Sequence, residues 1–428
     1  MSRVPSDAAG RLRNSEPPGV VGRRLAKQLA ERFGAAPDEI RVVFAPYRVC
    51  PLGAHIDHQL GHVTAWALDQ GVLLAFAPLE TPELRLASLD FPGQIAFHFS
   101  QITATSGGDA PRPPARDWGD YARGAVAALG ARHPLRRGWV GLVAGSMPES
   151  GLSSSAAVGV AYLLALEAVN RLDVAPLENV RLDQAIENGY LGLRNGVLDP
   201  AAVLLSRENH LTWLDCRSLE HECVRPSETT PPWALLLVYS GVRQSLAATE
   251  YNRRVSQCAE AARQLLEALG RSADPPVLRS VAPDEYESRC DRLDGPAARR
   301  AAHYFGEMRR VEQGLAAWRA GNLAELGRLV SESGRSSIEN YQCGAEPLVE
   351  LYHRLIETEG VYGARFSGAG FRGCCVALID PAAAETVARR ALSAYRRRFP
   401  ELADHAWATL CRSADGASLQ SWRLAAGG

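Results

Sequence analysis

Residues 148–160, PESGLSSSAAVGV, place a glycine and three serines directly before a long apolar run, and few local structures accommodate that order. Gly151 permits a sharp turn. The run at 156–172 is apolar on nearly every side, which predicts a buried helix. The N-terminus of a helix carries unpaired N–H groups and a partial positive charge, so it suits a phosphate group. Capping of the helix by Ser153 or Ser154 explains the serines equally well, and the stretch alone leaves both interpretations open.

A second glycine-rich stretch, GARFSGAGFRGCC at 363–375, includes Gly368 and Gly370. Such glycine density allows positive φ angles or the close approach of a ligand. A tight hairpin turn is the commoner explanation for one such stretch, and a second phosphate-facing loop is the more specific one. Neither stretch is a Walker A loop, because the chain has no Gly-Lys-Ser/Thr motif and its one lysine is Lys27.

The stretch PLGAHIDHQ at 51–59 follows a predicted strand and brings His55 and Asp57 close together. Two residues apart on a strand, these side chains would share one face. A zinc site needs three or four ligands, and no other His/Cys cluster is near, so the metal interpretation is weak. Hydrogen bonding to a polyhydroxylated ligand, with Arg48, suits them better. The ordinary alternative is a turn in which Asp57 caps the backbone.

Glu187 and Asp199 flank a glycine-containing segment that also holds Arg194 and Asn195. Two carboxylates in such a setting could divide the roles of metal ligand and general base. Solvated charges on a helix are the ordinary explanation and would normally be preferred.

Composition and charge argue against several classes of protein. The formal net charge of -1 offers no basic field for nucleic acid or an anionic membrane. No apolar run reaches the roughly 20 residues of a membrane helix, and the first residues lack the apolar core of a secretory signal. The nine cysteines are scattered without a CxxC pair, which favours reduced thiols in a cytoplasmic protein over disulfides or a zinc ribbon.

Hydrophobic periodicity and turn residues predict the order of the elements. Helices are predicted at 21–34, 120–130, 156–172, 180–196 and 382–399, and a mostly helical region at 250–360. Strands are predicted at 40–47, in 62–78 as two strands around Asp69-Gln70-Gly71, at 138–147, 211–216 and 233–241, and within 361–380. A Pro/Ser/Thr-rich stretch at 225–232 indicates a domain boundary.

Three of these stretches, in this order, resemble the signature motifs of the GHMP family of sugar kinases. APYRVCPLGAHIDHQLGHV resembles its sugar signature, PESGLSSSAA its phosphate loop, and GARFSGAGFRGCCVAL its third, glycine-rich motif. Because all three motifs agree, the ordinary explanations given above, such as helix capping and simple turns, are much less favoured. Within the family, IENGYLGLRNGVLD and SSIENYQCGAEPL resemble the galacturonokinases of plants and algae more than galactokinases proper.

The resemblance implies a two-lobed α+β fold, the GHMP kinase fold, with the active site between the lobes. The polar residues 1–20, with Pro17-Pro18, predict a flexible tail. An N-terminal domain at 21–228 would follow it and hold the sugar motif, the phosphate loop and the catalytic aspartate. A C-terminal domain at 229–428 would supply the third motif.

The resemblance also implies roles for individual residues. Asp199 would be the catalytic base, aided by Arg48, and galactokinases carry a glutamate where this chain has Ala54. That glutamate would repel a uronic acid by roughly 1 kcal/mol or more at contact distance. Arg243 is chosen by charge matching alone as the partner of the uronate carboxylate. The substrate-binding residues implied are Arg48, Ala54, His55, Asp57, Gly196, Asp199, Arg243 and Tyr251. The ATP-binding residues implied are Gly151, Leu152, Ser153, Ser154, Ser155, Ala156, Gly368 and Gly370, and the Mg²⁺ ligands are Ser155 and Glu187.

The activity implied is ATP- and Mg²⁺-dependent phosphorylation of D-galacturonic acid at C1, giving galacturonic acid 1-phosphate and ADP, by a cytoplasmic monomer or homodimer. Three alternatives remain. The chain could phosphorylate galactose, arabinose or glucuronic acid, or it could be a non-catalytic sugar sensor on the same scaffold. A serine hydrolase is the third, but no Gly-x-Ser-x-Gly elbow is present at the serine cluster.

Overall fold

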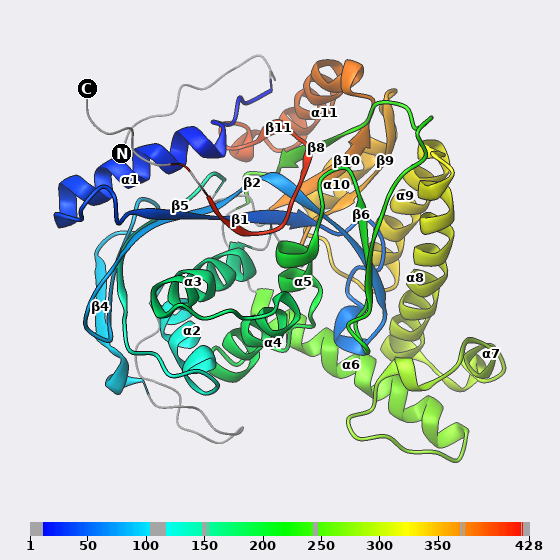
Figure 1. Cartoon of the computed structure of the whole chain (residues 1–428). Coiled ribbons are helices and arrows are strands. Elements are labelled where there is room, and N and C mark those ends of the chain that lie inside the picture. The colour runs from blue at the N-terminus through cyan, green and yellow to red at the C-terminus, as the bar shows by residue number, and fades with distance from the viewer. Residues whose placement is uncertain are drawn as a thin grey trace.

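Two β-sheets organise the chain, and helices pack against both of them (Figure 1). The computed structural model describes residues 12–102, 117–147, 152, 154–242, 247–368, 370, 373–420 and 422. Within these residues one sheet has nine strands and the other has four. The expected α+β fold class is confirmed.

The larger sheet has β1 and β2 at its centre, in the order β13-β1-β2-β5-β3-β4, with β6 and β12 also paired to β2 and β7 paired to β6. Its pairs are antiparallel except β3 and β5, which run parallel. The strands are β1 (Arg41–Val49), β2 (His62–Pro78), β3 (Glu83–Ser88), β4 (Gln94–His98), β5 (Trp139–Gly145), β6 (Leu211–Asp215), β7 (His221–Val224), β12 (Ser413–Ala414) and β13 (Ser418–Gln420).

Helices cover both faces of the larger sheet, because its central strands carry apolar side chains on both sides. Val42 and Phe44 of β1 pack with α1, whereas Val43 and Tyr47 pack into the core that includes α3. Figure 1 shows α1 on one face and α2 to α5 on the other. These helices are α1 (Pro18–Phe33), α2 (Asp120–Gly130), α3 (Ser154–Asn170), α4 (Pro176–Gln184) and α5 (Leu198–Leu205).

The smaller sheet has the order β11-β8-β10-β9 and is antiparallel throughout. Leu235 and Leu237 of β8 face the core shared with the larger sheet, and Leu236 and Val238 face α10 and α11. This alternation is the period of two expected of a strand buried on both faces. The elements are β8 (Ala234–Tyr239), β9 (Val361–Phe366), β10 (Cys374–Ile379), β11 (Trp407–Cys411), α6 (Ala247–Ala268), α7 (Pro283–Glu287), α8 (Gly295–Arg319), α9 (Leu323–Glu339), α10 (Glu346–Ile356) and α11 (Ala384–Arg398).

Both ends of the described chain join distant elements. Leu12 forms an isolated bridge with Ala408 of β11, and the Arg13 N–H donates to the Ala408 carbonyl at 2.7 Å. After the smaller sheet, the chain returns to the larger one through β12 and β13. The division at 228/229 and the tail at 1–20 stay predictions.

The prediction of two strands in 62–78 is wrong, because β2 runs through this segment without a break. Gly71 was interpreted as a turn residue, yet it lies in mid-strand opposite Pro46. A Cβ on Gly71 would come within 2.2 Å of the Ala45 carbonyl oxygen. The glycine therefore permits close approach of β1, which has a register irregularity between Pro46 and Arg48.

The prediction of one helix over 180–196 is also wrong. The α-helix α4 ends at Gln184, and a π-helical turn, η3 (Ala185–Tyr190), follows it. Residues 191–197 are not helical. Because a π-helical turn inserts an extra residue, it changes the direction of the side chains that follow, and such turns often occur at functional sites.

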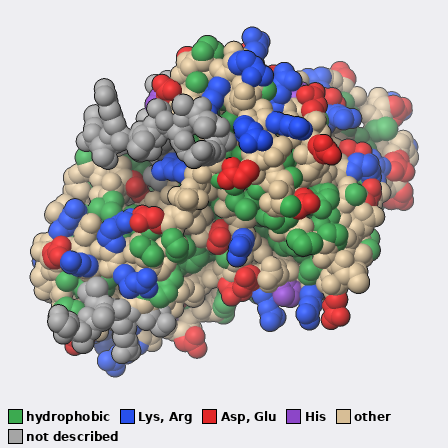
Figure 2. All heavy atoms as spheres, turned by 90° about the horizontal axis from the view of Figure 1, so that it is seen from above, with side chains coloured by type: hydrophobic (Ala, Val, Ile, Leu, Met, Phe, Trp, Pro, Cys, Tyr) green, Lys and Arg blue, Asp and Glu red, His purple; other side chains and the backbone are tan. Residues whose placement is uncertain are grey.

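The described surface carries mixed charge. Figure 2 shows Lys and Arg side chains interspersed with Asp and Glu on the face seen from above. Among the described residues, no helix is both long and apolar enough to cross a membrane.

Candidate active site

The stretch 51–59 folds into a compact turn between β1 and β2, so the prediction that His55 and Asp57 share a strand face is wrong. His55 has a φ of 63°, a left-handed conformation that is unfavourable for a residue with a Cβ, and Asp57 begins a 3₁₀ turn. Thr64 closes the turn, because its hydroxyl accepts from the Leu52 N–H at 3.1 Å and donates to the Leu52 carbonyl at 2.9 Å.

Arg48 and Asp199 form an ion pair in which Arg48 Nε donates to Asp199 Oδ1 at 2.6 Å. Arg48 lies at the end of β1, and Asp199 lies in the first turn of α5. Burial alone would lower the pKa of Arg48, but the charge and hydrogen bond of Asp199 raise it overall. The side chain of Asp199 is 21% exposed. A carboxylate that is paired with an arginine and still partly accessible suits a proton acceptor.

Asp57 lies against the start of α5. Its Oδ2 accepts from the Leu198 N–H at 3.4 Å. A Cβ on Gly196 would be 2.3 Å from the same oxygen, so only glycine fits there. Burial, and next the charge of Asp199, raise the pKa of Asp57 to about 6. Asp57 is therefore close enough to Asp199 to feel its charge.

Glu187 connects this pair to the start of α3. Its side chain is fully buried in the π-helical turn, and Oε2 accepts from the Asn195 amide at 2.6 Å. Burial, and next the charge of Asp199, raise the pKa of Glu187 to about 7, while Asn195 and the Ser155 hydroxyl oppose the shift. Glu187 thus has both Asp199 and Ser155 as neighbours, which brings the serine-rich helix end and the proposed base into one site.

Two residues near this carboxylate were not found from the sequence. Asp183, one helical turn before Glu187, is fully buried, and both of its oxygens lack a hydrogen-bond partner within the described residues. Burial, and next the charge of Glu187, raise its pKa well above the usual value. Tyr121 of α2 also lies near Ser155, since that hydroxyl lowers its pKa against the larger effect of burial. Neither residue belongs to a short motif, and only the packing of α2, α3 and α4 brings them here.

Aromatic side chains form a wall beside the 51–59 turn. The His55 ring stacks on Tyr341 at 4.4 Å between centroids, and His55 Nε2 lies 3.5 Å from Cys343 Sγ. Tyr251 of α6 meets His58 edge-on at 6.2 Å. Burial, and next the charges of Asp57, Asp199 and Glu187, raise the pKa of Tyr251, so α6 borders the carboxylates as well.

The glycine-rich stretch 363–375 includes the end of β9, the start of β10 and the connection between them, and its described residues Gly368 and Gly370 have positive φ. A Cβ on Gly370 would be 3.0 Å from Cys343 Sγ, the sulfur that contacts His55. Gly370 therefore lies close to the 51–59 turn and comes from the second half of the chain.

Of the remaining site residues predicted from the sequence, three are described in the structure and three are not. Leu152 and Ala156 are fully buried, and Ser154 begins α3. Gly151, Ser153 and Arg243 lie outside the described residues. Within the described residues, no group of three or more His, Cys, Asp and Glu side chains could hold a metal ion.

Comparison with known proteins yields three family matches. The description "GHMP kinases N terminal domain" matches residues 120–207, "GHMP kinases C terminal" matches 314–397, and "Galactokinase galactose-binding signature" matches 27–78. The third match contains the 51–59 turn, and the first contains Ser155, Glu187 and Asp199.

Similar proteins extend these matches to most of the chain. A galacturonokinase of Arabidopsis thaliana is 49% identical over 393 residues, covering 89% of this chain and 93% of that protein. Human galactokinase is 34% identical and covers 83% of this chain and 87% of its own. The crystal structure of Lactococcus lactis galactokinase complexed with galactose superposes with a TM-score of 0.83 at 25% identity, covering 93% and 98%. A mevalonate kinase structure, at 13% identity and a TM-score of 0.60, shares the fold over 87% of this chain and 99% of its own.

Proposed function

This chain belongs to the GHMP kinases and is a sugar 1-kinase, and we propose that it phosphorylates the anomeric hydroxyl of D-galacturonic acid. ATP would be the phosphate donor, and the products would be galacturonic acid 1-phosphate and ADP. Its similarity to the plant galacturonokinase along nearly the whole chain supports this substrate over galactose.

Ala54 is the observation that carries the substrate assignment. It occupies the position at which the galactokinase motif has a glutamate, and its side chain lies buried in the 51–59 turn. A carboxylate there would repel a uronic acid by about 1 kcal/mol or more, and by more if partly desolvated. A methyl group removes that repulsion and leaves space for the larger C6 carboxylate.

The proposed chemistry places Asp199 as the base that accepts the C1 hydroxyl proton. Arg48 would orient that carboxylate through their ion pair and stabilise charge that develops on the transferred group. Asp57, His55, Gly196 and Tyr251 would bind the sugar hydroxyls, and most of the rate enhancement would come from positioning and electrostatics. Arg243 remains the proposed partner of the uronate carboxylate, on charge grounds alone.

The residues near α3 fit a magnesium ion. Glu187 Oε1 is buried without a hydrogen-bond partner in the described structure, and a hard cation prefers such an oxygen. Because Mg²⁺ usually takes only one or two protein carboxylates besides phosphate oxygens and water, Glu187 and Ser155 would suffice to hold it. Bound there, Mg²⁺ would neutralise phosphate charge. The helix end at Ser154–Ala156, together with Gly368 and Gly370, would border the nucleotide phosphates.

The thiols support the proposed cytoplasmic location. All nine cysteines are free, and most are buried. Free thiols persist in a reducing compartment, whereas an oxidising one favours disulfides. A monomer or a homodimer is proposed for the oligomeric state.

A substrate panel tests the proposal. Galacturonic acid, glucuronic acid, galactose and arabinose would each be incubated with the protein, ATP and MgCl₂, and ADP release and the sugar phosphate measured. We expect galacturonic acid to give the largest kcat/KM and a 1-phosphate product. Preference for galactose would refute the substrate assignment, and sugar binding with no product for any sugar would favour the sensor alternative.

A further inference from the structure

The 51–59 turn is held from the second half of the chain by two side chains of α8. Glu307 Oε2 accepts from the Gly53 N–H at 2.7 Å, and His303 Nε2 is 2.9 Å from the Ala54 carbonyl oxygen. His303 and Glu307 are four residues apart, so they lie on one face of the helix. Together they fix the two residues immediately before His55.

The hydrogen bonds around His303 have a defined direction. A carbonyl only accepts, so Nε2 carries the hydrogen and Nδ1 accepts from the Ser336 hydroxyl at 2.9 Å. The Asn340 amide in turn donates to Ser336 at 3.2 Å. Burial lowers the pKa of His303 to about 4, which agrees with a neutral ring in this arrangement.

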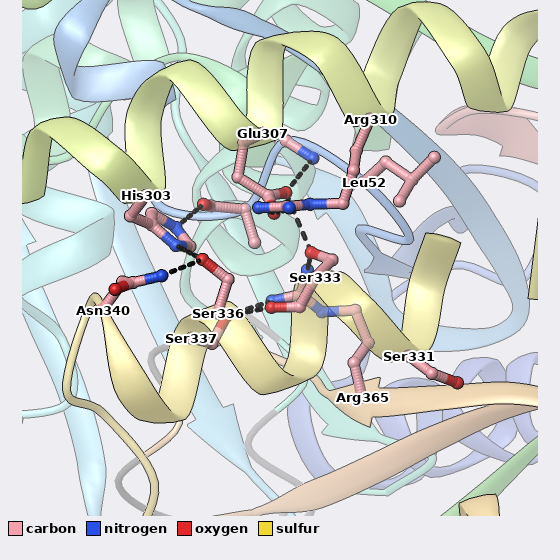
Figure 3. Close-up of polar contacts among 12 residues, drawn as sticks. Leu52, His303, Glu307, Arg310, Ser331, Ser333, Ser336, Ser337, Asn340 and Arg365 are labelled. Atoms are coloured by element: carbon pink, nitrogen blue, oxygen red, sulfur yellow. Dashed lines mark hydrogen bonds and ion pairs between the residues drawn. The ribbon is translucent and has the colours of Figure 1, made fainter. Parts of the chain in front are cut away.

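Glu307 is the centre of a second set of contacts (Figure 3). Besides Gly53, it accepts from the Ser333 hydroxyl at 2.8 Å and from Arg310 Nε at 2.8 Å. Arg365 of β9 donates to Ser333 and so joins the network. Burial alone would raise the pKa of Glu307, but Arg310, and after it His303, Arg365 and Ser333, hold it below its usual value. The carboxylate is therefore an ionised acceptor for the turn.

The same network also anchors the ring on which His55 stacks. The Tyr341 N–H donates to the Ser336 carbonyl at 2.9 Å, so Ser336 holds both His303 and the residue that packs on His55. A non-glycine residue at φ 63° persists only where its surroundings determine its conformation. Here those surroundings come from α8 and α9, far from the turn in sequence.

We propose that His303 and Glu307 are positioning residues that set the backbone of the 51–59 turn and thereby the orientation of His55 toward the sugar. The inference rests on the proposed function, because it takes this turn as the sugar site. If the two residues served stability alone, their replacement would change KM for the sugar and KM for ATP to a similar extent. If they position the turn, their replacement raises KM for the sugar much more than KM for ATP.

Three variants test this. His303→Phe keeps a ring but removes both hydrogen bonds, and His303→Gln restores an N–H that reaches the Ala54 carbonyl. Tyr352→Phe is the matched control, because it removes another hydrogen bond, a partly buried one to the Ser331 carbonyl at 2.7 Å, in the same half of the chain. We expect His303→Phe to raise KM for the sugar about tenfold, because, of its two lost hydrogen bonds, the one to the Ala54 carbonyl acts directly on the turn, with KM for ATP nearly unchanged. His303→Gln should recover most of that loss, and Tyr352→Phe should leave the ratio of the two KM values unchanged.

Equal changes in both KM values, or no recovery in His303→Gln, would overturn the proposal. If His303→Phe does not fold, Ser336→Ala loosens the His303 ring more mildly and should still raise the sugar KM selectively. If galacturonic acid is not the substrate, the same ratios are measured with whichever sugar is phosphorylated. The substrate panel therefore tests the substrate assignment, and the ratio of the two KM values tests the positioning role independently.

Discussion

Asp199 combines two properties that a general base needs. Arg48 holds it at 2.6 Å in an ionic hydrogen bond, and its side chain remains partly exposed. Replacement by asparagine keeps an oxygen for Arg48 but removes the basic lone pair. An asparagine at this position should therefore remove proton transfer while leaving substrate binding largely intact.

We predict that Asp199→Asn lowers kcat about a thousandfold, the usual size of a general-base effect, and leaves ATP affinity nearly unchanged. Sugar-dependent ADP release and calorimetric titration with ATP measure the two quantities. Asp215→Asn is the control, because Asp215 forms a similar pair with Arg279 at 2.8 Å and has no proposed role in catalysis. Turnover retained in Asp199→Asn would refute the assignment of the base.

Glu187 should make the free protein less stable at alkaline pH. Its pKa is raised from 4.5 to about 7 on folding, so the folded state binds the proton more tightly than the unfolded state. The stability from this proton is complete below about pH 4.5 and is lost as the pH rises through about 7. Above that range, the buried carboxylate of Glu187 is ionised and is not fully balanced by a positive charge unless a cation binds.

Glu187→Gln should therefore increase the free energy of unfolding at pH 8 by about 1 to 3 kcal/mol and change it little at pH 4.5. Urea titrations at both pH values, without metal or nucleotide, measure this. Glu346→Gln, whose carboxylate is largely exposed, should change stability by at most about 0.5 kcal/mol at either pH. A variant at Glu187 that is less stable than the wild type at pH 8 would contradict the prediction.

At the scale of elements, most of the long helices and the longer buried strands follow from periodicity, whereas the short helix α5 and the strands β3, β4, β7, β11, β12 and β13 were not predicted. Two of the wrong predictions have a clear physical reason. The helix 120–130 was predicted with the bounds it has, because its apolar spacing ends at a glycine. β2 was divided at Gly71 because a glycine required for close approach to β1 looks the same in sequence as a turn glycine. The π-helical turn at Ala185–Tyr190 has no local pattern, since tertiary packing determines it.

The candidate site shows the same limit. Arg48, Asp57, Glu187 and Asp199 were chosen from motifs, and the structure brings them together. Asp183, Tyr121, His303 and Glu307 were missed because their partners lie on other elements and no short pattern marks them. Short motifs contain the residues placed by one turn or one helix end, whereas residues that support such turns from a distance can be found only from the fold.

The contact between α3 and α4 should be intolerant of any side chain at Gly159. A Cβ there would lie 2.0 Å from Oδ1 of the buried Asp183, and Glu187 follows one turn later. Gly159→Ala should cost about 1 to 3 kcal/mol of stability by overpacking and should also lower kcat/KM, because it shifts the turn that carries Glu187. Gly189→Ala is the matched control, since nothing lies within 4 Å of a Cβ there. Thermal unfolding measures the stability of both variants, and steady-state kinetics measure their kcat/KM. Equal losses in Gly159→Ala and Gly189→Ala would contradict the prediction.

At the scale of the whole molecule, the two sheets share one core. Trp66 of β2, Trp233 just before β8 and Trp318 of α8 are mutual neighbours, with ring centroids 5.1 to 5.5 Å apart. Trp318 Nε1 also donates to the Val224 carbonyl at 2.7 Å. The helix that holds the 51–59 turn through His303 therefore also carries the tryptophan that packs both halves together.

Trp318→Ala should destabilise both halves at once. Loss of a fully buried tryptophan typically costs about 3 to 5 kcal/mol, and because the cluster belongs to a core shared by both sheets, the loss cannot be confined to one of them. Native-state hydrogen exchange, measured separately for peptides from β1–β2 and from β8–β10, should show protection falling by a similar factor in both. Trp118→Ala, at a half-buried site stacked on the exposed Phe91, is the control and should cost much less. If exchange in Trp318→Ala accelerated only in the smaller sheet, the halves would unfold independently, and the 51–59 turn would have to keep its conformation without support from α8.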